Sequence, residues 1–268
     1  MKIAFIGGGN MGRAMINAII RQELAVPEDI TVADPRQESR EALAVELGVT
    51  ATESNVAAAL SSDVVILAVK PQHLDEVMAG LSGQLCCDHL VISIIAGKKL
   101  SAIVDGLRHE AVIRVMPNTP AQIGLGMSVW TATDSVDVAQ KETARRILTA
   151  MGDELYTPDE ADLDKATAIS GSGPAYFFLF MEALVDAAVK LGLSPEAARQ
   201  MVIQTAVGSA EFAHQSEHEL GELRRMVTSP GGTTAEALKI FDSRQFRETI
   251  DIAVKAAFDR AQELGAPN

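Results

Sequence analysis

The first 120 residues contain short runs of consecutive apolar residues, separated by segments with helical periodicity. Runs that are apolar at successive positions are typical of strands in a parallel sheet that is covered on both faces. Their alternation with helices predicts an α/β doubly wound fold. The expected strands are Ile3–Ile6, Ile30–Ala33, Val64–Val69, Leu90–Ala96 and Val112–Met116, and the expected helices are Gly12–Ile20 and Gln37–Leu47.

The pattern changes near Tyr156, and after it only helical periods appear, with one break at Thr228–Thr234. Thr157–Glu160 has the order of a capping box, with Thr at N-cap, Pro at N1 and Glu at N3. We therefore expect an α/β domain at residues 1–156, followed by an all-α domain at residues 157–268.

A long helix is expected at Pro174–Leu191, closed by Lys190 and Gly192. Its first half, Pro174–Met181, is apolar nearly all round, and such a helix must be buried on every side. The next helix begins at Ser194–Glu196, with Ser at N-cap. A domain of this size cannot easily bury such a helix alone, so we expect a subunit interface.

The composition indicates a globular protein, because 47% of the 268 residues are hydrophobic and 22% are charged. The net charge of −13 argues against nucleic acid or an anionic membrane surface as a partner. Cys86 and Cys87 are adjacent, and we expect reduced, buried thiols in a cytosolic protein. The run Ile3–Ile6 is too short for a signal peptide, and no stretch reaches the ~18 unbroken apolar residues of a membrane span. A cytoplasmic location is therefore expected.

No metal site is expected, because the histidines lack a convincing ligand spacing. His214 and His218 are four residues apart, but no HExxH context surrounds them.

Gly7, Gly9 and Gly12 occupy the three places of a G-x-G-x-x-G motif between the first strand and the first helix. Such glycines permit a tight turn, close approach of the backbone to a pyrophosphate, and close helix–sheet contact. The helix N-terminus adds free N–H groups and the positive end of its dipole. This context predicts a dinucleotide-binding Rossmann domain. The alternative is a glycine turn without a nucleotide.

Asp34 closes the second strand, downstream of Gly12. A carboxylate there accepts a hydrogen bond from the ribose 2′-hydroxyl of NAD and repels the 2′-phosphate of NADP. Arg36, two residues on, would instead pair with that phosphate. The two residues thus favour different cofactors, and the alternative for Arg36 is a solvated surface arginine.

Two further loops follow strands at the edge where ligands of open α/β sheets bind. In Ala68–Pro71, the proline forces Lys70 out of helical geometry. Lys70 is either a proton donor or, as we favour, a residue whose backbone lines the cofactor groove. In Met116–Pro120, Asn118 supplies hydrogen-bonding groups near the expected nicotinamide, with a structural turn as the alternative.

Two glycine-rich segments in the helical half, Ile169–Pro174 and Thr228–Thr234, each precede a helix. Glycines permit anion-binding backbone geometry, and Ser and Thr add hydroxyls at a helix N-terminus. Two such segments in one domain favour a site for a substrate carboxylate. The alternative is a pair of capped helix starts.

These motifs together resemble those of the pyrroline-5-carboxylate reductase family, from the first strand to about Glu263. The matching segments are Phe5–Gly12, Ala68–Pro71, Arg114–Pro120, Ile169–Tyr176, Gly208–Ala210 and Val227–Thr234.

The resemblance implies a Rossmann domain followed by an all-α dimerisation and substrate domain that intertwines with a second subunit, the homodimers assembling to a decamer. It implies hydride transfer from NADP(H) to the imine carbon of a cyclic imine carboxylate, Δ1-pyrroline-5-carboxylate, to give L-proline. Thr234 is the catalytic candidate, with its hydroxyl at the imine nitrogen. The implied substrate-binding residues are Ser172, Glu217, Gly231, Gly232, Thr233 and Thr234, and the implied cofactor-binding residues are Ile6, Gly7, Gly9, Asn10, Met11, Gly12, Asp34, Arg36, Asn55, Ala68, Val69, Lys70, Pro71, Ala96 and Asn118.

Two other functions are alternatives to this one. A β-hydroxyacid dehydrogenase would resemble this chain in domain order, but Gly171–Phe180 lacks the catalytic lysine of that class. A non-catalytic dinucleotide sensor would not need the segment Thr228–Thr234. Many relatives in the resembled family carry Ser, Thr or Asn in place of Asp34, so NAD(H) is kept as an alternative to NADP(H).

Overall fold

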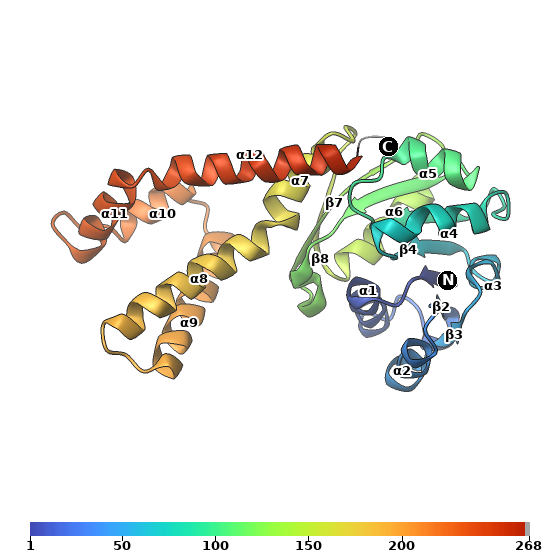
Figure 1. Cartoon of the computed structure of the whole chain (residues 1–268), viewed down its shortest axis with the longest axis horizontal. Helices are drawn as coiled ribbons and strands as arrows, with labels where there is room; N and C mark the ends of the chain where they lie inside the picture. The colour runs from blue at the N-terminus through green and yellow to red at the C-terminus, as the bar shows by residue number, and fades with distance from the viewer. Residues whose placement is uncertain (266–268) are drawn as a thin grey trace. The chain divides into compact units, whose positions relative to one another are not determined.

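The computed structural model of the chain describes residues 1–265 and forms two compact units (Figure 1). One unit contains Met1–Ser172 together with residues 257–265, and the other contains Gly173–Ala256. The last strand ends at Tyr156, and every later described element is helical. The domain boundary that we assign at residue 156 stays a prediction.

The first unit contains an eight-stranded sheet in the order β3-β2-β1-β4-β5-β6-β7-β8. The first six strands are parallel and have the Rossmann order, while β7 pairs antiparallel with β6 and parallel with β8. The doubly wound α/β fold expected from the sequence is therefore confirmed. The strands are β1 (Ile3–Ile6), β2 (Ile30–Ala33), β3 (Thr50–Thr52), β4 (Val64–Leu67), β5 (Leu90–Ser93), β6 (Val112–Met116), β7 (Gly126–Ala132) and β8 (Gly152–Tyr156).

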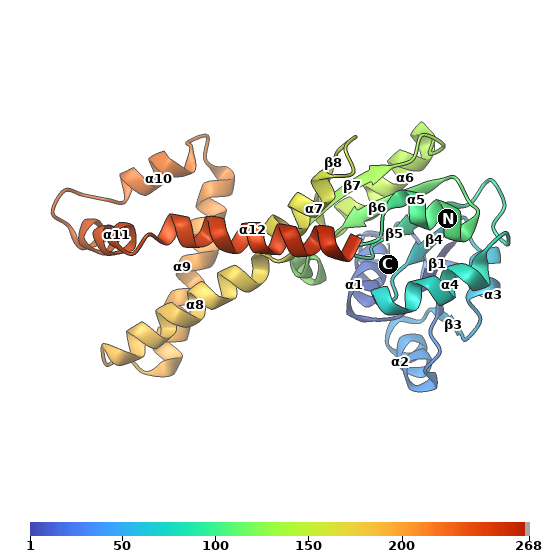
Figure 2. The same ribbon diagram turned by 45° about the horizontal axis from the view of Figure 1, so that its top comes forward.

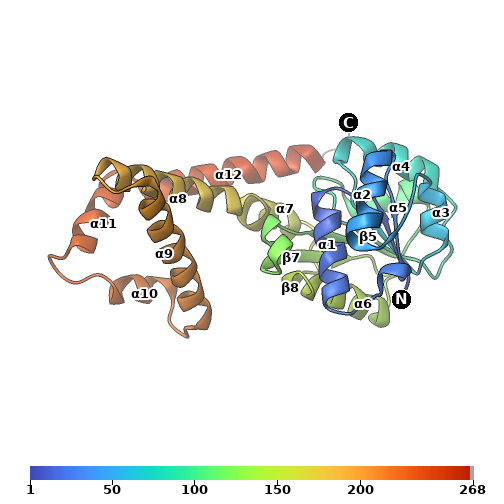
Figure 3. The ribbon, with the colours of Figure 1, turned by 90° about the horizontal axis from the view of Figure 1, so that it is seen from below.

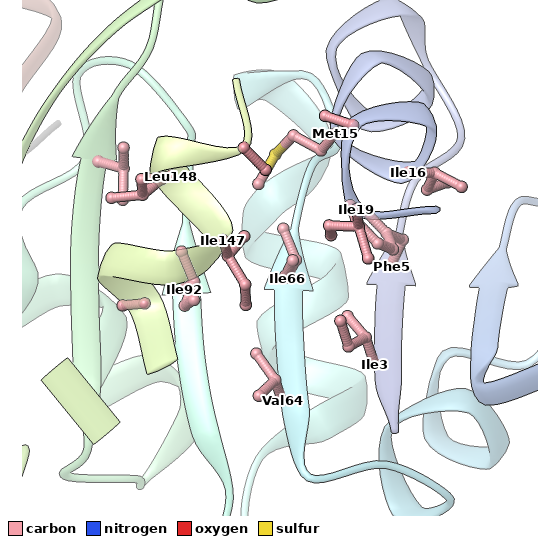
Figure 4. Packing of buried hydrophobic residues seen from close by; sticks show 14 of the residues in the cluster. Ile3, Phe5, Met15, Ile16, Ile19, Val64, Ile66, Ile92, Ile147 and Leu148 are labelled. Carbon is pink, nitrogen blue, oxygen red and sulfur yellow. The ribbon is translucent and has the colours of Figure 1, made fainter. Parts of the chain in front are cut away.

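Successive residues of β1 point into different cores on the two faces of the sheet. Ile3 and Phe5 pack with buried residues of α1, α2 and α6 (Figure 4). Ala4 and Ile6 pack with residues of α3, α4 and α5. Figure 3 shows the helices around the sheet. Because both faces are covered, the strands need apolar residues at every position. The helices of this part are α1 (Asn10–Arg21), α2 (Gln37–Leu47), α3 (Asn55–Leu60), α4 (Leu74–Leu81), α5 (Leu100–Leu107), α6 (Val138–Thr149) and α7 (Asp162–Ala166).

Three strands of the sheet were missing from the sequence prediction. β3 is short and polar, and β7 and β8 begin at glycines and include polar positions. β3 and β8 form the two edges of the sheet, and none of the three strands has the continuous apolar run that revealed the central strands. Their place is decided by pairing with strands that are already buried.

The second unit is built from helices, and α8 and α9 lie side by side within it (Figure 2). Ser194 caps α9 as expected, its hydroxyl accepting the N–H of Ala197 at 3.2 Å, and α8 ends at Lys190 before Gly192 with φ +100°. Beyond the expected break, the structure has further breaks at residues 216–219 and 244–245. The helices are α8 (Gly173–Lys190), α9 (Pro195–Gln215), α10 (Leu220–Met226), α11 (Thr233–Ser243) and α12 (Phe246–Gly265).

The apolar character of α8 leaves large side chains uncovered in the single chain. Phe177, Phe178 and Leu179 are 70%, 62% and 66% exposed. The stretch Asp162–Lys190 is also the one helix among residues 1–265 that is long and apolar enough to cross a membrane. Length and composition alone do not distinguish a membrane span from a helix buried between subunits.

The expected capping box at Thr157–Glu160 is wrong. Helix α7 begins only at Asp162, and the Thr157 hydroxyl instead donates to the Asp162 carboxylate at 2.6 Å. Glu160 does not reach back to the N-cap but binds Arg114 of β6. A buried cation competes successfully for that carboxylate, since an unpaired buried charge is very costly.

The expectation of buried thiols is also wrong, because Cys86 and Cys87 are both exposed, although free. They lie in the loop between α4 and β5 rather than in an element of the core. The Cys86 sulfur lies 2.9 Å from Nδ1 of the buried His89.

Candidate active site

The carboxyl ends of β1, β2, β4, β5 and β6 meet at one edge of the sheet, because these strands are parallel and paired in register. The chain order reverses between β1 and β4, which are neighbours in the sheet. Open α/β sheets bind ligands in the crevice at such a switch point. The loops that leave β1 and β4 there are Gly7–Gly9 and Ala68–Lys70, and both contain residues expected to bind the cofactor.

The three motif glycines have different structural duties. Gly7 has φ +107°, and a Cβ there would lie 2.7 Å from the carbonyl oxygen of Ala68. A Cβ on Gly12 would lie 2.8 Å from the Gly7 oxygen, so these two positions need glycine for the fold. Gly9 is exposed and a Cβ there would meet nothing within 4 Å. Packing within the chain therefore does not require glycine at position 9, and the space beside it is open.

Helix α1 begins directly after Gly9, which is its N-cap and supplies no side-chain cap. Within residues 1–265, no protein acceptor binds the N–H groups of Asn10, Met11 or Gly12, and the first turn contains no acidic residue. Unpaired N–H groups and the positive end of the helix dipole together form an anion site. The turn thus fits a dinucleotide pyrophosphate.

Asp34 is buried at the carboxyl end of β2 and is surrounded by donors. Oδ2 accepts the N–H of Gly8 at 3.3 Å and the hydroxyl of Ser39 at 3.1 Å, and Oδ1 accepts the N–H of Arg36 at 3.0 Å. The carboxylate therefore links the glycine turn to the start of α2. The sequence prediction missed Ser39, because a serine in the first turn of a helix is common and carries no signal of its own.

Arg36 pairs with Asp34 through Nε and Nη2, both at 3.3 Å, while its side chain stays 70% exposed. Burial acts to raise the pKa of Asp34, but the hydrogen bonds and charge of Arg36 outweigh burial and hold that pKa below its usual value. The same contacts raise the pKa of Arg36. Asp34 and Arg36, which we expect from the sequence to favour different cofactors, thus form an ion pair with each other.

The remaining cofactor candidates lie along the same edge. Lys70 is extended and exposed before a 3-10 turn begun by Pro71, which confirms the expected non-helical geometry. Ala68 bonds back to Ile6 through its N–H at 2.9 Å, while Ala96 lies in the loop after β5. Asn55 is the first residue of α3, directly after the N-cap Ser54.

Asn118 has structural partners on both sides of its amide. Its Nδ2 donates to the carbonyl of Ser170 at 3.1 Å, and its Oδ1 accepts the N–H of Met127 at 2.9 Å. The alternative of a structural turn is therefore supported for the side chain. One N–H of Asn118 Nδ2 and one lone pair of its Oδ1 remain for a ligand.

The segment Ile169–Pro174 does not form the expected anion-binding loop. Thr167–Gly171 is a π-helical turn that follows α7 and leads to α8, and the N–H of Ser172 donates to the Thr167 carbonyl at 2.8 Å. Because this N–H is used inside the helix, only the side chain of Ser172 remains for substrate. A π turn often marks a functional site, since it adds one residue to a helix and frees a carbonyl.

The segment Thr228–Thr234 does form a glycine-rich turn before a helix. Gly231 has φ +70°, and the N–H of Gly232 donates to the Ser229 carbonyl at 3.0 Å. Gly232 is the N-cap of α11, so Thr233 and Thr234 are its first two residues and no side chain caps it. In the described part of the chain, the Thr234 hydroxyl and the first N–H groups of α11 have no protein partner.

Glu217 lies in the short connection between α9 and α10, and its side chain is exposed. This connection and the glycine-rich turn stand at opposite ends of the seven-residue helix α10. Among residues 1–265, no group of three or more His, Cys, Asp or Glu side chains is placed to hold a metal ion.

The Rossmann sheet order, the glycine turn after β1 and the helical unit with its own glycine-rich turn before α11 define a dinucleotide-dependent oxidoreductase class. A family model described as pyrroline-5-carboxylate reductase dimerisation matches residues 160–264, and one described as coenzyme F420-dependent NADP oxidoreductase matches residues 2–97. The chain belongs to the pyrroline-5-carboxylate reductase family.

Individual relatives agree with this assignment over nearly the whole length. The chain is 44% identical to a pyrroline-5-carboxylate reductase of Pseudomonas aeruginosa, covering 98% of this chain and 96% of that one. It resembles the solved structure of the Coxiella burnetii enzyme with a TM-score of 0.91 at 38% identity, over 99% of each chain. The Plasmodium falciparum pyrroline carboxylate reductase with NADP bound has a TM-score of 0.90 at 32% identity, over 99% of this chain and 98% of that one.

Proposed function

We propose that this protein is a pyrroline-5-carboxylate reductase, which reduces the imine of 1-pyrroline-5-carboxylate to L-proline with NADPH as hydride donor. The family membership supports this reaction, and a relative with NADP bound supports the cofactor. NADH is the second cofactor that we consider, because Asp34 stands where a ribose 2′-hydroxyl is recognised.

The cofactor would bind along the carboxyl edge of the Rossmann sheet. The open space at Gly9 and the free N–H groups at the start of α1 fit its pyrophosphate. When bound, the reduced nicotinamide supplies the hydride. The residues that we assign to the cofactor are Ile6, Gly7, Gly9, Asn10, Met11, Gly12, Asp34, Arg36, Asn55, Ala68, Val69, Lys70, Pro71, Ala96 and Asn118.

The substrate carboxylate would bind at the start of α11. Free N–H groups and the positive end of the helix dipole there favour an anion. An imine accepts hydride readily once its nitrogen is protonated, so the chain has mainly to orient the ring. The Thr234 hydroxyl, which has no protein partner among residues 1–265, would bind the imine nitrogen. The other substrate residues that we assign are Ser172, Glu217, Gly231, Gly232 and Thr233.

The helical unit would act as the dimerisation domain. The exposed aromatic and aliphatic side chains of α8 would be buried against a second subunit. The family model for dimerisation matches residues 160–264. We propose a homodimer that assembles to a decamer in the cytoplasm, with no membrane or nucleic-acid partner. The net charge of −13 supports the last point.

The observation that carries the proposal is the presence, in one chain, of two helices that begin at a glycine N-cap without a side-chain cap, at Gly9 and Gly232. We assign both as anion sites. A dinucleotide-binding protein without a reaction needs only the first. The test is NADPH oxidation, followed at the nicotinamide absorbance, with pyrroline-5-carboxylate as substrate. We expect saturable turnover that yields proline, and no turnover of a 3-hydroxy acid with NADP. Turnover of the hydroxy acid alone would establish the β-hydroxyacid dehydrogenase instead.

A further inference from the structure

We propose that Asp34 sets the cofactor selectivity of this chain by holding Arg36 in an internal ion pair, so that NADPH and NADH are accepted with similar affinity. This inference rests on the proposed function. It assigns Asp34 a role that neither a NAD-specific nor a NADP-specific site would give it.

Position 34 is where a Rossmann fold distinguishes the two cofactors. The residue at the end of β2 faces the adenosine ribose, whose 2′-hydroxyl in NAD becomes a 2′-phosphate in NADP. Asp34 ends β2 through a backbone hydrogen bond to Thr52 of β3 at 3.1 Å, and its side chain is 5% exposed. Its place is therefore fixed by the sheet.

The carboxylate keeps three donors that do not depend on the Arg36 guanidinium. These are the backbone N–H groups of Gly8 and Arg36 and the hydroxyl of Ser39, at 3.3, 3.0 and 3.1 Å. If the guanidinium moved away, the buried carboxylate would still be hydrogen-bonded. The ion pair can therefore open without leaving a bare buried charge.

The guanidinium can leave at little cost because it is already largely in water. Its side chain is 70% exposed, and its other side-chain contact, with Ser39, is long at 3.5 Å. Arg40 is the neighbouring cation, and its guanidinium donates to backbone oxygens instead of the Asp34 carboxylate. The acceptors are the carbonyl oxygens of Asp34 and Pro35, both at 2.9 Å. Arg36 is thus the movable charge beside position 34.

The two cofactors would use the two states of this pair. With NADH, the ribose hydroxyls take the sites on Asp34 that Nε and Nη2 of Arg36 release. With NADPH, the 2′-phosphate binds the guanidinium, but the carboxylate 3.3 Å from Nε cancels much of the attraction. The ion pair thus weakens both a preference for NADPH and a preference for NADH. For this physical reason, we expect the chain to use both cofactors.

The test compares ligands that differ only in the 2′-phosphate, 2′,5′-ADP and 5′-AMP, by calorimetric titration of the intact oligomer. NADPH and NADH are then titrated in the same way. In the native chain, we expect the dissociation constants for NADPH and NADH to agree within about tenfold. Asp34→Asn should raise the preference for the 2′-phosphate by about tenfold or more, the scale of one charge-assisted hydrogen bond.

Two further variants keep the result decisive. Arg36→Ala changes an exposed side chain, so it should fold even if Asp34→Asn does not. It should lower affinity for 2′,5′-ADP about tenfold or more and leave 5′-AMP unchanged or tighter. Glu41→Gln removes a carboxylate charge seven residues after Asp34, at an exposed position of α2, and should leave the ratio unchanged.

Three outcomes would overturn the inference. One is an unchanged ratio in Asp34→Asn, a second is an equal change in Glu41→Gln, and a third is equal loss of both ligands in Arg36→Ala. If neither nucleotide binds the native chain, the proposed function itself fails. If both nucleotides bind and Asp34→Asn does not change the ratio of their affinities, the proposed reductase function stands. Only the inference about cofactor selectivity is then contradicted.

Discussion

The buried Arg114 of β6 donates to Oε1 of Glu160 at 2.8 Å, and the same oxygen accepts the backbone N–H of Leu100 at 2.7 Å. One carboxylate therefore joins a central strand, the start of α5 and the turn before α7. The side chain of Arg114 is 5% exposed, and Asp164 of α7 provides a second, longer contact at 3.4 Å.

Removal of Glu160 should destabilise the first unit. Glu160→Ala leaves Arg114 with only the longer contact to Asp164 at 3.4 Å. It also removes the acceptor of the Leu100 N–H. We expect a loss of about 3 kcal/mol in the free energy of unfolding, at the lower end for a broken buried ion pair. Urea denaturation measures it. As a control, Glu142→Ala breaks the exposed pair with Arg145 and should cost less than about 1 kcal/mol.

The glycine turn separates cofactor binding from folding. Gly9→Ala places a methyl group in open space, so the melting temperature should stay unchanged. NADPH binding should be lost, because the methyl group occupies the space that we assign to the pyrophosphate. Gly7→Ala would instead place Cβ 2.7 Å from the Ala68 oxygen and should destabilise the fold. Thermal melting and NADPH fluorescence titration on both variants distinguish the two effects. Normal NADPH affinity in Gly9→Ala would refute the pyrophosphate site.

The Thr234 hydroxyl should matter for turnover and not for stability. Because Gly232 is the N-cap of α11, the hydroxyl does not cap the helix. Thr234→Ala should lower kcat by roughly a hundredfold to a thousandfold, the usual loss for one hydrogen bond that strengthens in the transition state. Ser243→Ala, which removes a hydroxyl at the other end of α11, is the control. Near-normal turnover with a lowered Tm would show that the role is structural.

The exposed face of α8 should hold subunits together. Phe178→Glu puts a charge on an apolar helix and should dissociate the oligomer, because an unpaired carboxylate is costly in an apolar interface. Sedimentation velocity at micromolar concentration measures the change. Val45→Glu, at an apolar position of α2 that is 86% exposed, should leave the assembly intact. A well-folded native monomer would contradict the assignment.

His109 should make stability depend on pH. Burial lowers the pKa of His109 from its usual 6.5, and Nε2 donates to the His89 carbonyl at 2.8 Å. The unfolded chain then binds the proton more readily, so stability is full above pH 6.5 and falls as pH drops below that value. His109→Gln should flatten this dependence in unfolding experiments at pH 5.5 and 7.5. The exposed His214→Gln should preserve it.

Much of the architecture could be predicted because it depends on local signals. Continuous apolar runs such as Val64–Leu67 indicate a strand covered on both faces, and the glycine spacing at Gly7–Gly12 has few physical explanations. Capping at Ser194 is equally local, since it needs only the next three residues. The strands β3, β7 and β8 lacked such signals, because polar residues and glycines interrupt their apolar positions.

The amino-acid sequence alone determined the Rossmann order of elements, the apolar helix that needs a partner, and the glycine turn before Thr234. Only the tertiary structure decided how the polar groups pair. Asp34 binds Arg36, Glu160 binds Arg114 instead of capping α7, and the Ser172 N–H is used inside a π turn. The reason is physical: a buried charge or N–H takes whichever partner the folded chain brings within reach.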